Sequence, residues 1–309
     1  MLRDACGRTI DYLRLAVTDY CNLRCRYCLS PGVPARLAHD DCLRFEEMAA
    51  VARAFVALGG RKIRLTGGEP LRKRNLPVLV RQLAALRPRP ELTMTTNGVL
   101  LAAVAPELAA AGLQRVNVSC DTLRPATFRA LTGSDAQPAV VRGIDAALAA
   151  GLRPVRLNAV ILRGVNDDEP AALAAFARER GCELRFIEQM PVPGADFIPV
   201  AGAEIRARLA AAGWRLEPDP EPGDGGIAVR YRAGGQHIGF ISAHRHGSCA
   251  TCSRLRPCLY SPYEIDLKPA LRAGADVGGL LREAVAHKPV RGVAAADDCL
   301  VRPMLQTGG

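Results

Sequence analysis

Cys21-Asn22-Leu23-Arg24-Cys25-Arg26-Tyr27-Cys28 follows, after two residues, the apolar run Leu13-Arg14-Leu15-Ala16-Val17-Thr18. Three thiols at this spacing indicate a metal site rather than disulfides, because an odd number of cysteines cannot all pair with one another. A zinc site normally needs a fourth Cys or His nearby, or an open catalytic position. A 4Fe-4S cluster with three protein thiolates leaves one iron free to bind a cofactor.

A glycine-rich segment, Gly67-Gly68-Glu69-Pro70, follows the strand-like run 62–66. The two glycines allow the backbone to approach a ligand closely, and Glu69 supplies a carboxylate for an ammonium group. Together with C-x3-C-x2-C and the aromatic Tyr27, this segment resembles the radical S-adenosylmethionine (SAM) superfamily. The resemblance implies a 4Fe-4S cluster whose open iron holds SAM and whose electron releases a 5′-deoxyadenosyl radical. A structural zinc knuckle is the alternative.

The composition is that of a globular chain. With 309 residues and 49% hydrophobic content, it can bury one large core or a core plus a smaller domain. Charges interrupt the first 14 residues and no apolar run reaches ~18 residues, so we expect no signal peptide and no membrane span. Eleven cysteines then favour a reducing cytoplasm. The net charge of +10 suggests an acidic ligand, but the scattered basic residues lack aromatic interleaving, so no nucleic acid partner is expected.

Apolar or β-branched runs alternate with longer Ala- and Leu-rich stretches through the first two thirds of the chain. Strands are expected at 12–17, 62–66, 92–96, 115–119, 154–161 and 184–188. Helices are expected near 45–58, 76–86, 101–111, 138–150, 169–180 and 202–212. Six strand-helix units favour parallel pairing with right-handed crossovers, and six are too few for an eight-fold barrel. We therefore predict an α/β fold, a partial (β/α)6 barrel over residues 1–215, as the radical SAM resemblance also implies.

A stretch rich in Pro, Gly and acidic residues at 217–226 marks a linker or a long hairpin. Beyond it, strands are expected near 228–232 and 238–241, and helices near 263–273 and 276–286. Residues 216–309 are therefore predicted to form a smaller C-terminal extension.

Polar residues stand near the carboxyl ends of the predicted strands, which in a parallel barrel meet at one mouth. For any single one of them, a turn or cap role is the alternative. The superfamily resemblance implies that SAM is contacted by Tyr27, Gly67, Gly68, Glu69, Thr95, Asn97, Ser119 and Met190. Asp121, Asn158 and Glu188 also stand at strand ends or within strands, without an assigned contact.

A second group of three thiols, Cys249, Cys252 and Cys258, lies in the C-terminal region. With it, the resemblance narrows to the GTP 3′,8-cyclase family of molybdenum cofactor biosynthesis. Membership would imply two 4Fe-4S clusters, the first on Cys21, Cys25 and Cys28 and an auxiliary one on Cys249, Cys252 and Cys258. It would also imply conversion of GTP to (8S)-3′,8-cyclo-7,8-dihydroguanosine 5′-triphosphate, with Gly308 and Gly309 reaching the active site as a catalytic tail.

The sequence has no Walker-type G-x4-G-K-[ST], so side chains would have to hold a triphosphate. Guanidinium groups suit this role because they bind phosphate oxygens in a bidentate fashion. By position in the family's motifs, the candidates are Arg14, Lys62, Arg64, Arg156, Arg185, Arg254 and Arg256. Two of them depart from the family pattern. Arg156 stands where Lys is common, and a shortened Cys252-Cys258 loop leaves open which family arginine Arg256 matches.

Three hypotheses follow from these motifs. The chain is a GTP 3′,8-cyclase, a radical SAM enzyme with another substrate, or a non-catalytic iron-sulfur or zinc-binding paralogue. A cyclase would need GTP and an electron-donor protein as partners, and a homodimer stays an open expectation. Metal identity separates the third hypothesis from the others, because a protein that holds only zinc would not cleave SAM.

Overall fold

A computed structural model describes residues 1–28, 43–189, 197–220, 228–242, 254–257 and 263–288. Six predicted site residues lie outside these ranges, so their predicted roles stay predictions: Met190, Cys249, Cys252, Cys258, Gly308 and Gly309.

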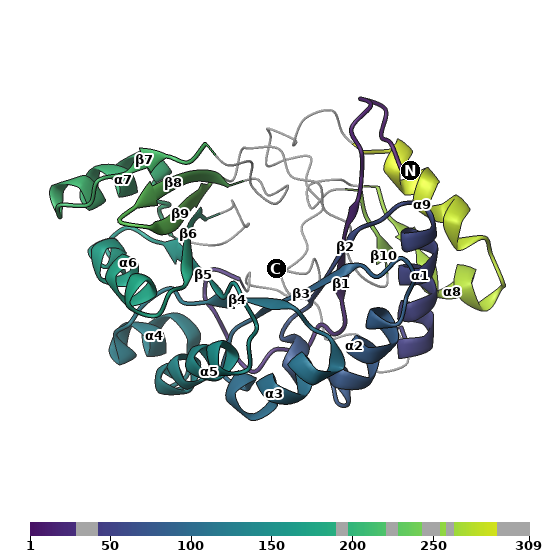
Figure 1. The fold of residues 1–309 in the computed structure, drawn as a ribbon, viewed down its shortest axis with the longest axis horizontal. Coiled ribbons are helices and arrows are strands. Elements are labelled where there is room, and N and C mark those ends of the chain that lie inside the picture. The colour runs from purple at the N-terminus through teal and green to yellow at the C-terminus, as the bar shows by residue number, and fades with distance from the viewer. Residues whose placement is uncertain (29–42, 190–196, 221–227, 243–253, 258–262, 289–309) are drawn as a thin grey trace.

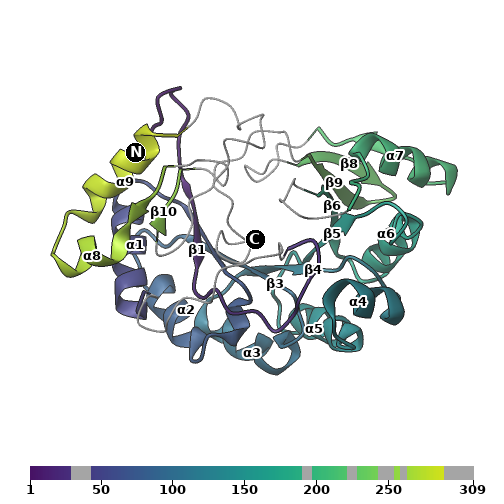
Figure 2. The same cartoon turned by 180° about the vertical axis from the view of Figure 1, so that it is seen from behind.

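One sheet organises the described chain. Its first six strands run in chain order: β1 (Tyr12–Ala16), β2 (Lys62–Thr66), β3 (Glu91–Thr96), β4 (Arg115–Ser119), β5 (Arg156–Ile161) and β6 (Glu183–Glu188). Every neighbouring pair among them is parallel. The helices that connect them cover the outer side of a curved sheet (Figure 1; Figure 2 from behind). The predicted partial barrel and its six strands are therefore confirmed.

The helices begin and end within a few residues of the predicted positions. They are α1 (Phe45–Ala57), α2 (Leu76–Ala84), α3 (Leu101–Ala111), α5 (Gln137–Ala149), α6 (Pro170–Glu179) and α7 (Gly202–Ala211). A further helix, α4 (Pro125–Thr132), was not predicted. It starts with a proline at its first turn and ends at Gly133 with φ +71°, which are start and stop signals in a segment too short to show a clear period.

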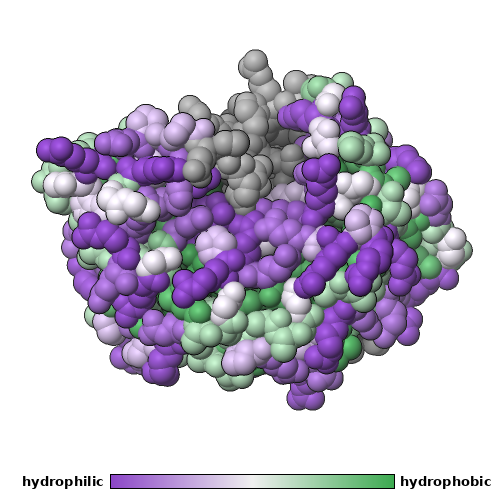
Figure 3. Space-filling view, viewed as in Figure 1, coloured by the Kyte–Doolittle hydropathy of each residue, from purple (hydrophilic) through white to green (hydrophobic). Residues whose placement is uncertain are grey.

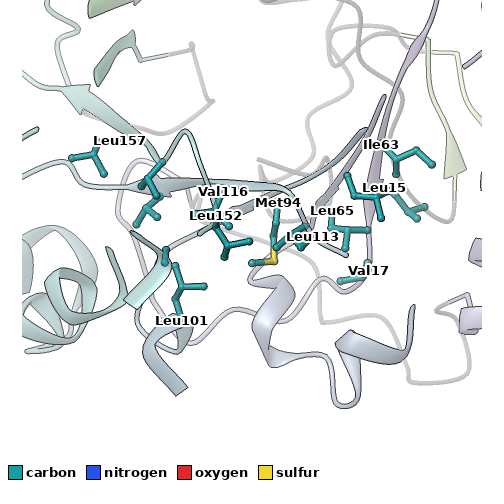
Figure 4. Close-up of a cluster of buried hydrophobic side chains, with 14 of the residues drawn as sticks. Leu15, Val17, Ile63, Leu65, Met94, Leu101, Leu113, Val116, Leu152 and Leu157 are labelled. Atoms are coloured by element: carbon teal, nitrogen blue, oxygen red, sulfur yellow. The ribbon is translucent and has the colours of Figure 1, made fainter. Parts of the chain in front are cut away.

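Side-chain alternation along each strand separates an apolar outer face from a polar inner face. Leu65 of β2, Met94 of β3 and Val116 of β4 are fully buried, and they lie together with Leu101 of α3 (Figure 4). Residues at even spacing from these point to the same side because side chains alternate along a strand. The apolar face packs against the helices, and the other face carries the polar side chains of the strands.

The sheet continues past the predicted domain boundary at residue 215. Strand β9 (Gln236–Ile241) pairs in parallel with β6, and it is followed across the sheet by antiparallel β8 (Val229–Ala233) and β7 (Glu217–Pro218). The β7 to β8 pairing favours the hairpin over the linker for the Pro- and Gly-rich stretch.

The last described segments pack at the other end of the sheet, beside β1 and α1 (Figure 1). They are β10 (Arg254–Leu255), β11 (Ile265–Asp266), α8 (Leu267–Arg272) and α9 (Val277–Ala286). Arg272 Nε lies 3.0 Å from Glu47 Oε1 of α1, and buried Lys288 Nζ donates to the Pro257 carbonyl at 2.7 Å. The C-terminal segments thus flank one edge of the half-barrel and the β7 to β9 strands the other. No helix in the described ranges is long and apolar enough to cross a membrane.

Candidate active site

The cysteine loop leaves β1 at the carboxyl edge of the sheet and lies against the end of α4. The Arg24 N–H donates to the Thr132 carbonyl at 3.0 Å, and the Arg26 N–H donates to the Leu131 carbonyl at 2.9 Å. Within the loop, the Cys28 N–H donates to the Cys25 carbonyl at 3.0 Å. The backbone between the first and third thiols is therefore fixed by main-chain bonds to α4 and within the loop.

The two glycines of the Gly-Gly-Glu-Pro segment bring its backbone against the backbone that leads into the cysteine loop. A Cβ on Gly67, which has φ +143°, would lie 2.2 Å from the Thr18 carbonyl oxygen, and one on Gly68 would lie 2.5 Å from that of Tyr20. The Gly68 N–H donates to Thr18 O at 2.8 Å, and the Glu69 N–H donates to Tyr20 O at 2.7 Å. In this structure the glycines allow a close contact between two loops, and their predicted contact with SAM stays a prediction.

Glu69 is fully buried and accepts three hydrogen bonds. Its Oε1 accepts from the Leu71 N–H at 3.0 Å and the Thr96 hydroxyl at 2.7 Å, and its Oε2 accepts from the Asn97 N–H at 2.7 Å. Burial raises the pKa of this carboxyl to about 7, although the three hydrogen bonds act in the opposite direction. Because a carboxylate offers about four acceptor positions, about one is left for the ammonium group of the predicted SAM contact, which stays a prediction.

Asn97 links the end of β3 to the first cysteine. Its Nδ2 donates to Asn22 Oδ1 at 2.8 Å and lies 3.7 Å from Cys21 Sγ. Thr95, two residues earlier, points to the inner face and accepts from Arg64 Nη1 at 3.2 Å. Of these two predicted SAM contacts, the structure thus brings Asn97 to the cysteine loop and Thr95 to the cationic face described below.

Asp121 joins the loop to the ends of β4 and β5. The Tyr27 hydroxyl donates to its Oδ2 at 2.5 Å, and the Val160 N–H donates to its Oδ1 at 2.9 Å. Burial raises the pKa of Asp121 to about 6 and holds the pKa of Tyr27 above its ordinary value. Ser119, a predicted SAM contact, is half-buried at the end of β4, beside Asn158 of β5.

The surroundings of the three thiols in the loop favour metal-bound thiolates over free thiolates. Burial raises the pKa of Cys21 and of Cys25, and for Cys25 the negative charges of Asp121 and of the two other cysteines raise it further. Positive metal ions are what would stabilise the thiolate forms at such a place. In the described ranges, no group of three His, Cys, Asp or Glu side chains is arranged to hold a single metal ion. A 4Fe-4S cluster does not need such an arrangement, because each of its thiolates binds a different iron.

The inner face of the half-barrel is cationic. Strand register places Arg14 beside Arg64, Thr93 beside Arg115, Asn117 beside Arg156, and Asn158 beside Arg185. Within strands β1 to β6, the charged side chains of this face are Arg14, Lys62, Arg64, Arg115, Arg156, Arg185, Glu91 and Glu183. Six positive and two negative groups leave a formal charge of +4. Figure 3, seen from the same side as Figure 1, shows hydrophilic side chains across the middle of the molecule.

Both acidic residues of this face hold predicted phosphate ligands. Glu183 Oε2 lies 2.5 Å from Arg156 Nε, and Glu91 Oε2 lies 3.6 Å from Lys62 Nζ. Glu91 also forms a close ion pair with Arg115. Lys62 and Arg64 both lie over the ring of Tyr12, at 5.3 and 5.7 Å from its centroid. The cations are therefore held in place before any ligand binds.

Two predicted arginines lie away from this face, in the C-terminal segments. Arg254 pairs with Asp266 in the β10 to β11 ladder. Arg256 is buried, its Nε lies 3.3 Å from Glu264 Oε2, and it lines a small apolar cavity with residues such as Leu2, Phe55 and Leu281. These surroundings indicate that Arg256 anchors the C-terminal segment to β1 and α1.

The motifs did not single out every residue that shapes the site. The motifs place Asp121 only at a strand end, and they do not include Arg115, Glu91 or Glu183. The alternation Arg115-x-Asn117-x-Ser119 already carried the signal, because it places a cation on the same face as two polar residues of the mouth.

Comparisons with known proteins were consistent across the chain. The radical SAM superfamily model matches residues 15–177, and the model described as Molybdenum Cofactor Synthesis C matches residues 182–293. A GTP 3′,8-cyclase of Moorella thermoacetica is 44% identical over 100% of both chains. GTP 3′,8-cyclase 1 of Pseudomonas aeruginosa is 42% identical, over 99% of this chain and 98% of that protein.

Solved structures show the same fold at low sequence identity. SuiB of Streptococcus suis, bound to S-adenosylmethionine, superposes with a TM-score of 0.60 at 17% identity. The match covers 88% of this chain and 67% of that one. It supports the half-barrel architecture and, at this identity, nothing beyond the fold.

Proposed function

Because the chain belongs to the GTP 3′,8-cyclase family of the radical SAM superfamily, we propose that it converts GTP to (8S)-3′,8-cyclo-7,8-dihydroguanosine 5′-triphosphate. This is the first step of molybdopterin biosynthesis. Superfamily membership implies a 4Fe-4S cluster and SAM. When bound, these groups supply a 5′-deoxyadenosyl radical that takes the 3′ hydrogen of the ribose.

One observation carries the proposal: a cysteine loop and a cationic inner face share one half-barrel. Cys21, Cys25 and Cys28 would hold the first cluster at the carboxyl edge of the sheet. The inner face, with a formal charge of +4, suits a triphosphate that carries about four negative charges. A face of this kind is not needed to bind SAM, whose own charges are few, so it indicates a polyanionic second substrate.

The roles of the side chains follow from their contacts. Arg14, Lys62, Arg64, Arg156 and Arg185 would bind the triphosphate, and Arg115 adds a further cation on the same face. Glu91 and Glu183 hold three of these cations in fixed positions, so little reorganisation is needed when the nucleotide binds. Arg254 would contact the nucleotide from the C-terminal side, and Arg256 would anchor that segment.

Cys249, Cys252 and Cys258 would hold the auxiliary cluster, and Gly308 and Gly309 would enter the active site as a tail without side chains. Tyr27, Gly67, Gly68, Glu69, Asn97, Ser119 and Met190 would surround SAM, directly or by shaping the loops around it. Thr95 would lie between SAM and the nucleotide, since Arg64 already donates to it. An electron-donor protein would complete the system.

The test uses anaerobically reconstituted protein with SAM and a strong reductant, with GTP, with ATP, or with no nucleotide. We expect 5′-deoxyadenosine and an isomer of GTP to appear together, and only with GTP. Equal SAM cleavage in all three mixtures, with GTP unchanged, would point to a radical SAM enzyme with another substrate. A protein that holds only zinc and leaves SAM intact would be the non-catalytic paralogue.

A further inference from the structure

We propose that Asp121 is a positioning residue that fixes the cysteine loop through the hydroxyl of Tyr27. The inference rests on the radical SAM part of the proposed function, because it concerns the loop that would hold the first cluster. Asp121 lies 94 residues from Tyr27 in the sequence, and the contact between them joins the loop to the carboxyl ends of β4 and β5.

The carboxylate of Asp121 is shared between two segments. Its Oδ2 accepts from the Tyr27 hydroxyl at 2.5 Å, and its Oδ1 accepts from the Val160 N–H of β5 at 2.9 Å. Only 8% of the residue is exposed. A hydrogen bond to a charged acceptor in such surroundings is stronger than one at the surface, so the phenol has one preferred position.

The backbone around this carboxylate is itself clamped. Asn166, which is fully buried, donates from Nδ2 to the Asp121 carbonyl at 2.7 Å and to the Val160 carbonyl at 2.9 Å. Its Oδ1 accepts from the Leu162 N–H at 2.8 Å. One residue beyond Asp121, the Thr122 hydroxyl donates to Glu169 Oε1 at 2.5 Å. Asp121 is therefore fixed in position, and the Tyr27 hydroxyl of the loop binds to this fixed carboxylate.

Tyr27 lies close enough to the thiols in the sequence that holding it in place also restricts their positions. It adjoins Cys28 and lies two residues from Cys25, and neighbouring Cα atoms are about 3.8 Å apart, so fixing the backbone of Tyr27 limits the movement of both cysteines. The other side of the loop is held through Asn97 and by the main-chain bonds of Arg24 and Arg26. Three thiolates must meet three irons of one cube, which tolerates little movement at any of them.

The experiment measures how fast an iron chelator removes iron from the reconstituted full-length protein. The three C-terminal cysteines are replaced by alanine, so that the iron reports the first site alone. We expect Tyr27→Phe and Asp121→Ala each to release iron about tenfold faster, as the loss of one charge-assisted hydrogen bond allows. The double variant should be no faster than Asp121→Ala alone, because both changes remove the same contact.

Asp121→Asn is the rescue variant. Its amide oxygen can accept from the Val160 N–H and its amide nitrogen can donate to the phenol oxygen, so iron release should stay within about threefold of the wild-type rate. Tyr263→Phe is the matched control, since it removes a tyrosine–carboxylate hydrogen bond of the same length, from the Tyr263 hydroxyl to Glu283 Oε1 at 2.5 Å, in the C-terminal segments and without touching Tyr27. In the otherwise unmodified enzyme, Tyr27→Phe should raise KM for SAM more than it lowers kcat for 5′-deoxyadenosine release.

If the Tyr27→Phe variant released iron at the wild-type rate, the proposal would be overturned, even if the Asp121→Ala variant failed to fold. Multiplicative effects in the double variant would also overturn it, as would an Asp121→Asn protein as labile as Asp121→Ala. A wild-type protein that retains its iron but leaves GTP unchanged would contradict the cyclase proposal alone, so the two failures are distinguishable.

Discussion

At the scale of single residues, the site depends on close approaches that few side chains permit. Gly68 is the clearest example, because a Cβ there would lie 2.5 and 2.6 Å from the carbonyl oxygens of Tyr20 and Asp19. These atoms are backbone, so they cannot rotate away as the end of a side chain can. The residues before Cys21 would have to move instead.

Gly68→Ala should therefore lower the free energy of unfolding by about 1–3 kcal/mol, the usual cost of overpacking, and reduce the iron content of the reconstituted protein. Thermal melting and iron analysis measure the two effects. Gly202→Ala is the control, because the nearest atom to its Cβ would be Phe240 Cβ at an ordinary 3.5 Å. Equal losses in both variants would show that the Gly68 contact has no special role.

Arg156 tests the assignment of the inner face. Arg156→Ala should raise KM for GTP about tenfold or more, since a hydrogen bond to a charged group contributes ~1.5–3 kcal/mol. Arg156→Lys should raise it less, because it keeps the charge and loses the bidentate fork. Arg81→Gln, on the exposed outer side of α2, is the control. An unchanged KM for GTP in the Arg156→Ala variant would show that this residue does not bind the triphosphate.

At the scale of elements, charged side chains on the outside hold helices to loops. Glu204 of α7 lies 2.6 Å from Arg163 Nη2 and 2.9 Å from Arg208 Nη2, and Arg208 also reaches Asp167 at 3.0 Å. Hydrogen bonds from Arg163 and Arg208 lower the pKa of Glu204 to about 2. This network joins α7 to the turn between β5 and α6, which also carries Asn166.

The lowered pKa predicts an effect on acid stability. A carboxyl with a lowered folded-state pKa stabilises the fold above its ordinary pKa of 4.5, and that contribution disappears as pH falls towards about 2. In the Glu204→Gln variant, the free energy of unfolding should therefore fall less than in the wild type as pH drops from 4.5 towards about 2. Urea unfolding at low salt measures this difference. Added salt should shrink the difference, because the pairs are exposed. A Glu204→Gln protein with the wild-type pH profile would contradict this account, and Glu107→Gln on α3 is the control.

Much of the sheet could be predicted from the sequence because its strands are short apolar runs between long helical stretches. Strands β2 and β4 begin and end at the predicted residues. The continuation through β9 could not be predicted, since pairing between Leu184 and Ile238 is a long-range contact with no local signal. For the same reason the motifs located the cysteines and the arginines but not Asp121, whose role depends on a partner 94 residues away.

At the scale of the whole molecule, the fold separates two kinds of surface within one half-barrel. Helices cover the outer side, and the inner side carries a formal charge of +4. The cysteine loop lies at the carboxyl edge of the strands, while C-terminal segments flank the β1 edge. A nucleotide bound within the curve would thus have its phosphates on the sheet and its ribose towards the loop.

This arrangement predicts that nucleotide binding responds strongly to ionic strength. KM for GTP should rise as salt is added, while KM for SAM should change little, because the triphosphate alone meets the cationic face. Steady-state kinetics at several salt concentrations measure both values. Equal responses of the two constants would contradict the division of the site.

The most direct test of the central claim uses GTP that carries deuterium at the ribose 3′ position, with SAM and reductant under anaerobic conditions. Mass spectrometry of the 5′-deoxyadenosine should show one deuterium gained, together with a cyclised nucleotide that has lost it. Unlabelled 5′-deoxyadenosine beside unchanged GTP would contradict the account and assign the radical to another substrate.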